Sequence, residues 1–116
     1  MRELIRSGIY TNKIMILDER GEDNAYHEYE IRSFDKQKVL GNISFQNGPL
    51  KENKLNGCFQ EDLIEICIDR LRCFQDGDFA CRENALALTK LEEALMWLNS
   101  RTRDRVIRGV EGKSEQ

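Results

Sequence analysis

The chain has 116 residues, which suits one ordinary domain and is too short for two full ones. Hydrophobic residues make up 40% and charged residues 34%, and the single proline argues against a long disordered linker. The formal net charge of −3 excludes a generally basic coat for nucleic acid. There is no apolar run of signal-peptide length and none near the about twenty residues of a membrane span, so we expect a cytoplasmic protein.

Alternation of apolar and polar residues predicts β-strands in the first part of the chain. We expect strands at about 13–17, within AYHEYEIRSF (25–34) and within KVLGNISFQN (38–47). Three or four antiparallel strands would then form a sheet within residues 1–46. Residues 47–57 hold two Asn-Gly steps and the only proline, which indicates a turn-rich loop.

The apolar spacing then changes to a helical period, which predicts a helical hairpin over 58–109 and a tail at 110–116. The apolar face of the first helix consists of Leu63, Ile64, Cys67, Ile68, Leu71 and Phe74. A break at 75–78 provides Asp78 as the expected N-cap of a second helix, from about 79 to 108. The predicted fold class is α+β in a single domain: a small N-terminal antiparallel sheet followed by the hairpin.

The second helix is predicted to be long, because about thirty helical residues span about 45 Å. Its apolar stripe repeats in a heptad-like pattern through Leu88, Leu91, Leu95 and Leu98. This length exceeds what a small sheet needs, so we expect the hairpin to pack against a second copy of itself. The alternative is that the last two turns simply project or fray.

The residues that enzymes and metal sites use are sparse. Cys58, Cys67, Cys73 and Cys81 are expected to be reduced thiols in the core, since no secretory signal accompanies them. No CxxC spacing exists and the single His27 is distant in sequence, so no metal site is predicted. The phosphate-binding GxxxxGK[ST], GxGxxG, HExxH and GxSxG motifs are all absent. We therefore predict neither an enzyme nor a cofactor.

Charge is distributed unevenly along the hairpin. Residues 60–93 carry nine acids against four bases, whereas residues 99–108 carry four arginines against one acid. Arg101, Arg105 and Arg108 recur at i, i+4 and i+7 on one helical face, a spacing suited to gripping adjacent phosphates or carboxylates. The same arginines could instead cap the helix C-terminus, or contact nucleic acid with a weak electrostatic footprint.

Three further side chains near these positions carry possible roles. Phe74 closes the first helix and is either a core residue or a platform for stacking on a purine. Asn84 has an amide that could read a base edge or a ribose hydroxyl. Trp97 is expected in core or interface packing.

Two runs of the sequence carry a family resemblance. GNISFQNGPLKENKLNGCFQEDLIEICIDRL and FQDGDFACRENALALTKLEEALMWLNSRTRDRVIRGVEG resemble the phage-encoded Thoeris anti-defence sponge proteins over about residues 41–112. The shared features are the FQNGP turn with KE, an NG step before the first helix, and ALMWL followed by an arginine-rich end and RGVEG. The first forty residues carry no match beyond being strand-like.

The resemblance implies a sponge in the host bacterial cytosol rather than an enzyme. Such proteins sequester, without cleavage, the cyclic ADP-ribose isomer made by a bacterial TIR protein, and so keep the Thoeris effector inactive. The ligand is held at a homodimer interface, and the dimers can associate towards hexamers. Some relatives also bind cyclic di- or trinucleotides in a separate pocket. Neither DNA, RNA nor a membrane is implied as a partner.

Carried over residue by residue, the resemblance implies that Phe74 stacks on adenine, that Asn84 contacts the ligand, and that Arg101 and Arg105 grip the diphosphate. Arg108 and Val110 would lie near the ligand as a lid. Gly48 and Asn56 in the turn-rich loop would belong to the second pocket.

One alternative does not involve a nucleotide. The chain could be a non-enzymatic oligomeric interaction protein whose arginine row pairs with an acidic partner surface, which residues 60–93 of another subunit could supply.

Overall fold

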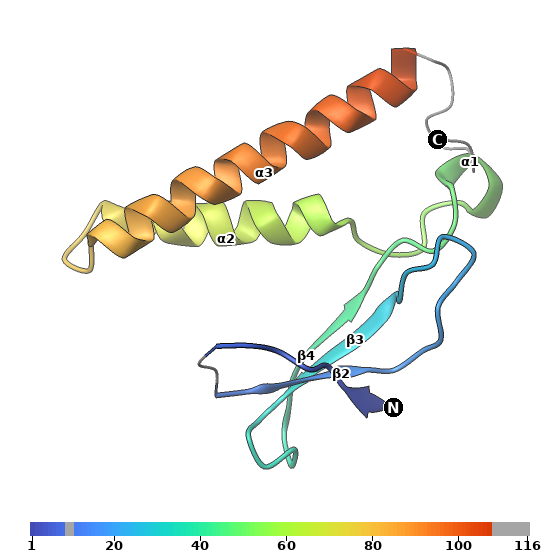
Figure 1. The fold of residues 1–116 in the computed structure, drawn as a ribbon, viewed down its shortest axis with the longest axis horizontal. Coiled ribbons are helices and arrows are strands. Elements are labelled where there is room, and N and C mark those ends of the chain that lie inside the picture. The colour runs from blue at the N-terminus through green and yellow to red at the C-terminus, as the bar shows by residue number, and fades with distance from the viewer. Residues whose placement is uncertain (9–10, 108–116) are drawn as a thin grey trace. The chain divides into compact units, whose positions relative to one another are not determined.

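The computed structural model describes residues 1–8 and 11–107, which fold into two compact units. The sheet unit comprises Met1–Cys58, and the hairpin unit begins at Phe59. The strands and helices (Figure 1) are β1 Arg2–Glu3, β2 Lys13–Ile16, β3 Glu28–Arg32, β4 Val39–Ser44, α1 Leu50–Asn53, α2 Gln60–Gln75 and α3 Arg82–Ile107. This is the predicted α+β class, with the antiparallel strands first and the long helix last.

The sheet unit holds one antiparallel sheet in the order β1-β2-β3-β4. Because Ile14 pairs with Ile31 and Ile16 pairs with Tyr29, these four side chains share one face of the sheet. Ile43 joins this apolar face through its pairing with Tyr29. The opposite face carries the buried Met15 among mostly polar side chains, such as Glu28, Glu30 and Asn42.

The turn-rich loop is more ordered than the sequence indicated. It contains the single-turn helix α1, and its end returns to the sheet through a parallel bridge between Phe45 and Cys58. The N–H of Gln46 donates to the carbonyl of Cys58 over 2.7 Å, and the N–H of Cys58 donates to the carbonyl of Ser44 over 2.8 Å. The loop is therefore fixed at both ends within the sheet unit.

The first helix of the hairpin matches its prediction closely. Helix α2 begins after Phe59, whose N–H donates to the Asp62 carboxylate over 2.9 Å, so an acidic side chain satisfies an otherwise unpaired donor at the helix start. Glu61 and Asp62 in this first turn also complement the helix dipole.

The second helix begins later than predicted, at Arg82 rather than near residue 79, so Asp78 is not its N-cap. The reason is a side chain that the pattern did not reveal. The amide of Gln75 accepts from the N–H of Cys81 over 2.9 Å and donates to the carbonyl of Cys81 over 3.1 Å. This two-way bond ties the end of α2 to Cys81, so the intervening residues form a turn rather than helix.

The helices α2 and α3 lie side by side in the hairpin unit (Figure 1). The leucine stripe of α3 is half-buried along its whole length, as an inward-facing stripe should be. Ile68 on α2 is only 2% exposed and is the one fully buried side chain among the hairpin residues that the structure describes. Helix α3 has 26 residues against 16 in α2, which confirms a second helix longer than its neighbour.

Many apolar side chains of the hairpin unit stay exposed. They are Phe59, Ile66, Phe79, Leu86, Met96, Trp97 and Val106. Trp97 is 63% exposed, so within one chain it is not a core residue. The four cysteines are free, as expected, but the prediction that they lie in the core was wrong, because Cys67, Cys73 and Cys81 are exposed and Cys58 is half-buried. A two-helix hairpin offers too little interior to hold them.

Candidate functional site

The two arginines predicted to grip a diphosphate lie together near the end of α3. They are four residues apart, so they lie on the same side of the helix about one turn apart. Arg101 is exposed and its Nη2 lies 3.8 Å from Oε2 of Glu61 in the first turn of α2. Arg105 is half-buried. This end of α3 therefore carries two arginines on one side of the helix, of which Arg101 lies beside the start of α2.

Phe74 and Asn84 lie at the other end of the hairpin. Phe74 is half-buried in the last turn of α2, and the guanidinium carbon of Arg70 lies 4.9 Å from its ring centroid. Asn84 is half-buried in the first turn of α3, and its amide donates to the carbonyl of Phe79 over 3.4 Å. An aromatic ring and an amide are thus placed beside the connection between the helices.

A single chain does not bring the four predicted residues into one pocket. Asn84 and Arg101 are separated by 17 positions of α3, which is about 26 Å along a helix. The aromatic and amide group therefore forms one half-site, and the arginine pair forms another. Their joint role in a ligand site remains a prediction.

Arg108 and Val110, predicted as a lid, lie outside the described residues. For Gly48 and Asn56 of the predicted second pocket, the structure gives contacts within the loop itself. Gly48 has a left-handed backbone with φ of 87°, and a Cβ there would clash with the side chain of Asn53. The Asn56 amide accepts from the N–H of Asn47 and donates to its carbonyl, each over 2.8 Å. Both positions thus hold the loop together, and their contact with a ligand remains a prediction.

A shallow groove of about 560 Å³ lies between α2 and α3. Its lining residues are Ile68, Arg72, Glu92, Leu95, Met96, Asn99, Ser100 and Arg103. Arg103 is two positions from Arg101 and therefore about 200° around the helix, so this groove lies on a different flank from the arginine pair. A 2.8 Å ion pair between Arg72 and Glu92 joins the helices there.

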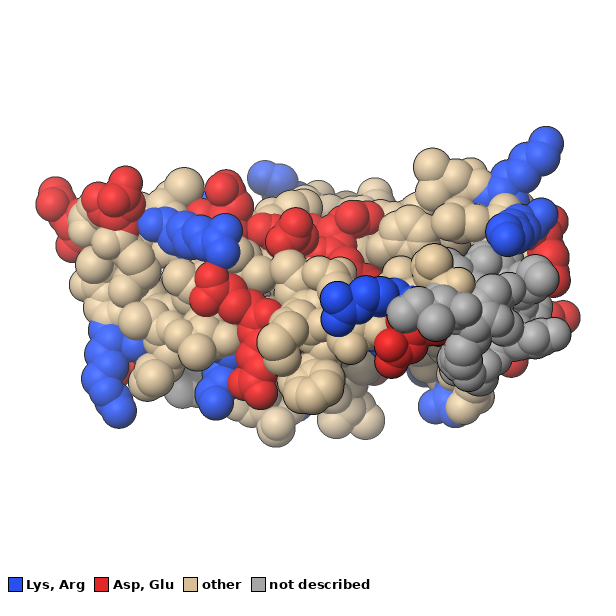
Figure 2. All heavy atoms as spheres, turned by 90° about the horizontal axis from the view of Figure 1, so that it is seen from above, with Lys and Arg blue, Asp and Glu red and all other residues tan. Residues whose placement is uncertain are grey.

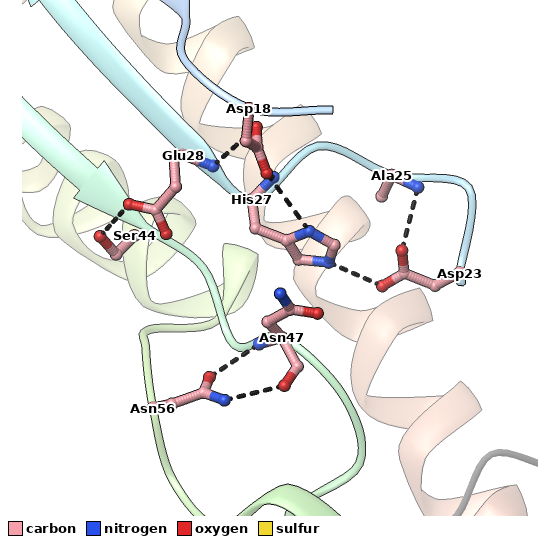
Figure 3. A network of polar contacts seen from close by, with 8 residues as sticks. All are labelled: Asp18, Asp23, Ala25, His27, Glu28, Ser44, Asn47 and Asn56. Atoms are coloured by element: carbon pink, nitrogen blue, oxygen red, sulfur yellow. Dashed lines mark hydrogen bonds and ion pairs between the residues drawn. The ribbon is translucent and has the colours of Figure 1, made fainter. Parts of the chain in front are cut away.

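The buried polar centre of the molecule is in the sheet unit. His27 is only 3% exposed, and its Nε2 lies 2.9 Å from Oδ2 of Asp23, while Nδ1 lies 3.7 Å from Oδ2 of Asp18 (Figure 3). Asp18 also accepts the N–H groups of His27 and Glu28, at 3.0 and 3.2 Å. These contacts hold the β2–β3 connection against the first residue of β3, which gives His27 a structural role.

The two carboxylates beside His27 are stabilised in their ionised form. Burial alone would raise the pKa of Asp18, but the N–H donors of His27 and Glu28 outweigh it and hold the pKa below its usual value. Burial likewise works to raise the pKa of Asp23, and the N–H of Ala25 together with the His27 ring lowers it overall. Within residues 1–8 and 11–107, no three His, Cys, Asp or Glu side chains are grouped so that they could hold a metal ion.

Acidic and basic side chains are interspersed on the face of the molecule drawn in Figure 2, without a continuous basic field. A duplex-binding surface would need such a field to neutralise successive phosphates. No helix in the described part of the chain is long and apolar enough to cross a bilayer.

The sequence patterns missed two residues at the predicted half-sites, Glu61 beside Arg101 and Arg70 over Phe74. A signal for the first was available. In an antiparallel hairpin the acidic start of the first helix lies opposite the basic end of the second, so pairing across that end could be expected. Arg70 and Phe74 are four residues apart on α2, which is the ordinary spacing of side chains that touch along a helix.

The sequence of the hairpin is similar to that of known proteins. Residues 37–103 match the Acb2/Tad1 hairpin domain. That match spans β4, the turn-rich loop, α2 and most of α3, which is more than half of the chain, so the chain belongs to the Acb2/Tad1 hairpin-domain family. The class that the fold defines is thus a helical-hairpin domain attached to an antiparallel sheet.

A curated relative is similar to this chain. The protein named Thoeris anti-defense 1, from Bacillus phage SBSphiJ7, is 57% identical over 77 residues. The aligned part is 66% of this chain and 54% of that protein, so the chain spans about half the length of the relative that it matches.

Proposed function

We propose that the protein is a phage anti-defence sponge, which binds the cyclic ADP-ribose isomer made by Thoeris TIR proteins and holds it without cleavage. The observation that carries the proposal is the match of the hairpin to the Acb2/Tad1 family, together with 57% identity to a Thoeris anti-defence protein. Sequestration in the host cytosol would keep the Thoeris effector inactive.

The arginine pair supports this choice of ligand. A diphosphate carries two negative charges close together, and guanidinium groups four residues apart on α3 match that spacing. Phe74 offers an aromatic ring, and stacking of a base on such a ring contributes about 1–3 kcal/mol. Asn84 adds an amide that can donate to or accept from the ligand.

The distance between the half-sites supports a pocket shared by two copies. Two hairpins that pack antiparallel to each other place the α3 end of one beside the α2–α3 connection of the other. Phe74 and Asn84 of one chain would then face Arg101 and Arg105 of its partner. By symmetry such a dimer has two equivalent pockets, and further association of dimers would give hexamers.

The exposed apolar side chains of the hairpin support the proposal that a second copy of the chain covers this surface. Trp97 and Ile66 are each 63% exposed, and a hairpin with so little buried apolar surface gains little stability by itself. Packing against a second hairpin would remove these side chains from water. We include in the proposal that the protein acts as a homodimer or a larger homo-oligomer.

Non-catalytic capture is the expected chemistry. In the proposed pocket the chain supplies two guanidinium groups, an aromatic ring and an amide, none of which is a nucleophile with an adjacent base. We place a second pocket, for cyclic di- or trinucleotides, beside Gly48 and Asn56, whose own contacts also hold the loop together.

The test is binding followed by recovery. Purified protein is titrated with the cyclic ADP-ribose isomer released by a TIR enzyme, and the complex is then denatured by heat. We expect tight binding, and we expect mass spectrometry to identify the intact cyclic nucleotide in the supernatant. Recovery of a linear nucleotide would contradict sequestration and indicate an enzyme.

The second candidate function is an oligomeric interaction protein whose arginine row pairs with an acidic surface. The contact between Arg101 and Glu61 favours this second function, because it shows an arginine of the row paired with an acidic side chain of the hairpin. That function predicts an oligomer that dissociates as salt rises and whose melting temperature no cyclic nucleotide raises.

A further inference from the structure

Arg101 is paired with a carboxylate in the ligand-free chain. Its guanidinium Nη2 lies 3.8 Å from Oε2 of Glu61, with the arginine side chain 52% exposed and that of Glu61 only 22% exposed. Glu61 lies in the first turn of α2, whose start is fixed by the hydrogen bond from the Phe59 N–H to the Asp62 carboxylate. The carboxylate is therefore held beside Arg101 by a helix rather than by a flexible loop.

This contact changes what an anion meets at the end of α3. The negative charge of Glu61 partly offsets the positive charge of Arg101, so the electrostatic potential at this end of α3 is less positive than the two arginines alone would make it. An anion that approaches Arg101 must displace the carboxylate or tolerate its repulsion. A ligand that brings only phosphates has Arg105 alone to offset that cost, whereas one that also stacks and hydrogen-bonds elsewhere gains further contacts.

We propose that Glu61 is a positioning residue that acts through Arg101, as a built-in counter-anion which sets the affinity threshold of the arginine pair. It lowers the affinity of simple phosphate compounds at this end of α3, so that they do not fill the site at ordinary concentrations. Glu61 also holds the Arg101 guanidinium beside the hairpin until a ligand replaces the carboxylate. The inference rests on the proposed function, because it assigns Arg101 to the ligand site.

The experiment measures binding of inorganic pyrophosphate and of ADP by calorimetry to the wild-type protein and to Glu61→Gln. We expect Glu61→Gln to bind both about threefold to tenfold more tightly, from removal of one nearby negative charge at a partly screened surface. A residue with a merely structural role would weaken binding or leave it unchanged when replaced. Equal or weaker pyrophosphate binding, or no measurable binding by either protein, would overturn the inference.

Two further variants separate a local effect from a general one. Glu65→Gln makes the same change of net charge one turn further along α2, at an exposed residue with no ion pair to any residue that the structure describes, and it should change affinity less than twofold. The affinity gain of Glu61→Gln should vanish when Arg101 is also replaced by Ala, because the carboxylate acts through that arginine. A gain that persists without Arg101 would contradict the proposed route.

The outcomes distinguish this inference from the proposed function. If Glu61→Gln tightens pyrophosphate binding through Arg101 but no variant binds the cyclic ADP-ribose isomer, the counter-anion role stands and the sponge function fails. If the wild-type protein binds the cyclic ligand tightly but Glu61→Gln leaves pyrophosphate binding unchanged, the sponge function stands and the counter-anion role fails.

Discussion

The sheet unit and the hairpin unit differ in the side chains that they bury. In the sheet unit the buried imidazole of His27 lies between two carboxylates, and Met15 and Ile16 are buried on opposite faces of β2. In the hairpin unit one described side chain is fully buried, while Trp97 and other large apolar groups remain exposed. Large apolar side chains are exposed in both units, among them Ile5 and Phe34 in the sheet unit and Phe79 and Trp97 in the hairpin unit, so the two units differ in their buried polar contacts rather than in their exposed apolar surface.

The family match covers most of the hairpin unit and only the last part of the sheet unit. It begins at residue 37, so it includes β4 and the hairpin but leaves β1, β2 and β3 outside. The His27 network also lies outside the matched segment except for its neighbours on β4. The part shared with the family therefore includes Phe74, Asn84 and Arg101 of the proposed site.

The largest expected effect comes from the one fully buried side chain of the hairpin. Replacing Ile68 by Ala should lower the free energy of unfolding by about 2–5 kcal/mol, because it leaves a cavity between α2 and α3. The matched variant Ile66→Ala removes the same side chain where it is 63% exposed. In the monomer it should cost much less, and any larger cost should depend on protein concentration. Chemical denaturation at two protein concentrations measures the unfolding free energy of both variants. An equal loss in Ile68→Ala and Ile66→Ala that does not depend on concentration would contradict the division between a core position and a partner surface.

The next effect concerns binding rather than folding. Replacing Arg105 by Ala should weaken binding of the cyclic ADP-ribose isomer by about 10- to 100-fold, since a charge-assisted hydrogen bond is lost. The control is Arg103→Ala, which removes the same charge on a different flank of α3 and should change the affinity little. Calorimetry gives the affinities, and circular dichroism shows whether the fold is kept. If Arg105→Ala unfolded the protein, the arginine would be structural.

A smaller effect on stability is expected in the sheet unit. Asp18→Ala leaves the N–H groups of His27 and Glu28 without their acceptor, which should cost about 1–3 kcal/mol of unfolding free energy. Glu19→Ala, at the exposed neighbouring position, is the control and should be nearly neutral. Because Phe74, Asn84, Arg101 and Arg105 are all in the hairpin, Asp18→Ala should leave the affinity for the cyclic ADP-ribose isomer within about twofold of wild type. A large loss of affinity would contradict the independence of the two units.

The smallest expected effect is a pH dependence of the sheet unit. Folding lowers the pKa values of Asp18 and Asp23, so both carboxylates stabilise the fold above their unfolded pKa of about 3.9. That contribution is lost as the pH falls through the lower folded values. Thermal unfolding between about pH 5 and pH 2 should show a falling melting temperature, and the fall should be shallower in Asp18→Asn. An equally steep fall in that variant would mean that other groups cause the acid sensitivity.

The sequence predicted the elements well where a local pattern sets them. The strands at 13–17 and 38–47 and the first helix followed from alternation and helical spacing, and the structure places strands and a helix there with small shifts at the ends. The start of α3 could not be predicted from Asp78. The side-chain amide of Gln75 bonds to the backbone of Cys81 and keeps it in the turn, and no periodic pattern reveals that contact. The burial of the cysteines was predicted wrongly because periodicity identifies an apolar face but not how much of it one chain covers.

In the candidate site, too, local spacing could be predicted from the sequence and the particular contacts between helices could not. The pairing of Arg101 with Arg105 is a property of helical spacing and could be recognised in the sequence. The separation of Asn84 from Arg101 along α3 also follows from counting residues. Opposite charges at the open end of an antiparallel hairpin favour a contact between Arg101 and an acid of the first turn of α2, but only the packing of the helices selects Glu61. The burial of His27 could not be predicted, because its two carboxylate partners lie in the preceding loop, where no periodic pattern marks which side chains meet.

The most direct test of the account is whether one ligand pocket draws residues from two chains. The variants Phe74→Ala and Arg105→Ala should each lose high-affinity binding of the cyclic ADP-ribose isomer when purified alone, so binding is measured at ligand concentrations that only an intact pocket fills. When they are mixed and allowed to exchange subunits, the mixed dimers regain one complete pocket, so the binding capacity measured by calorimetry should return to about a quarter of the wild-type value. No recovery after exchange, with mixed dimers verified by native mass spectrometry, would contradict the shared pocket.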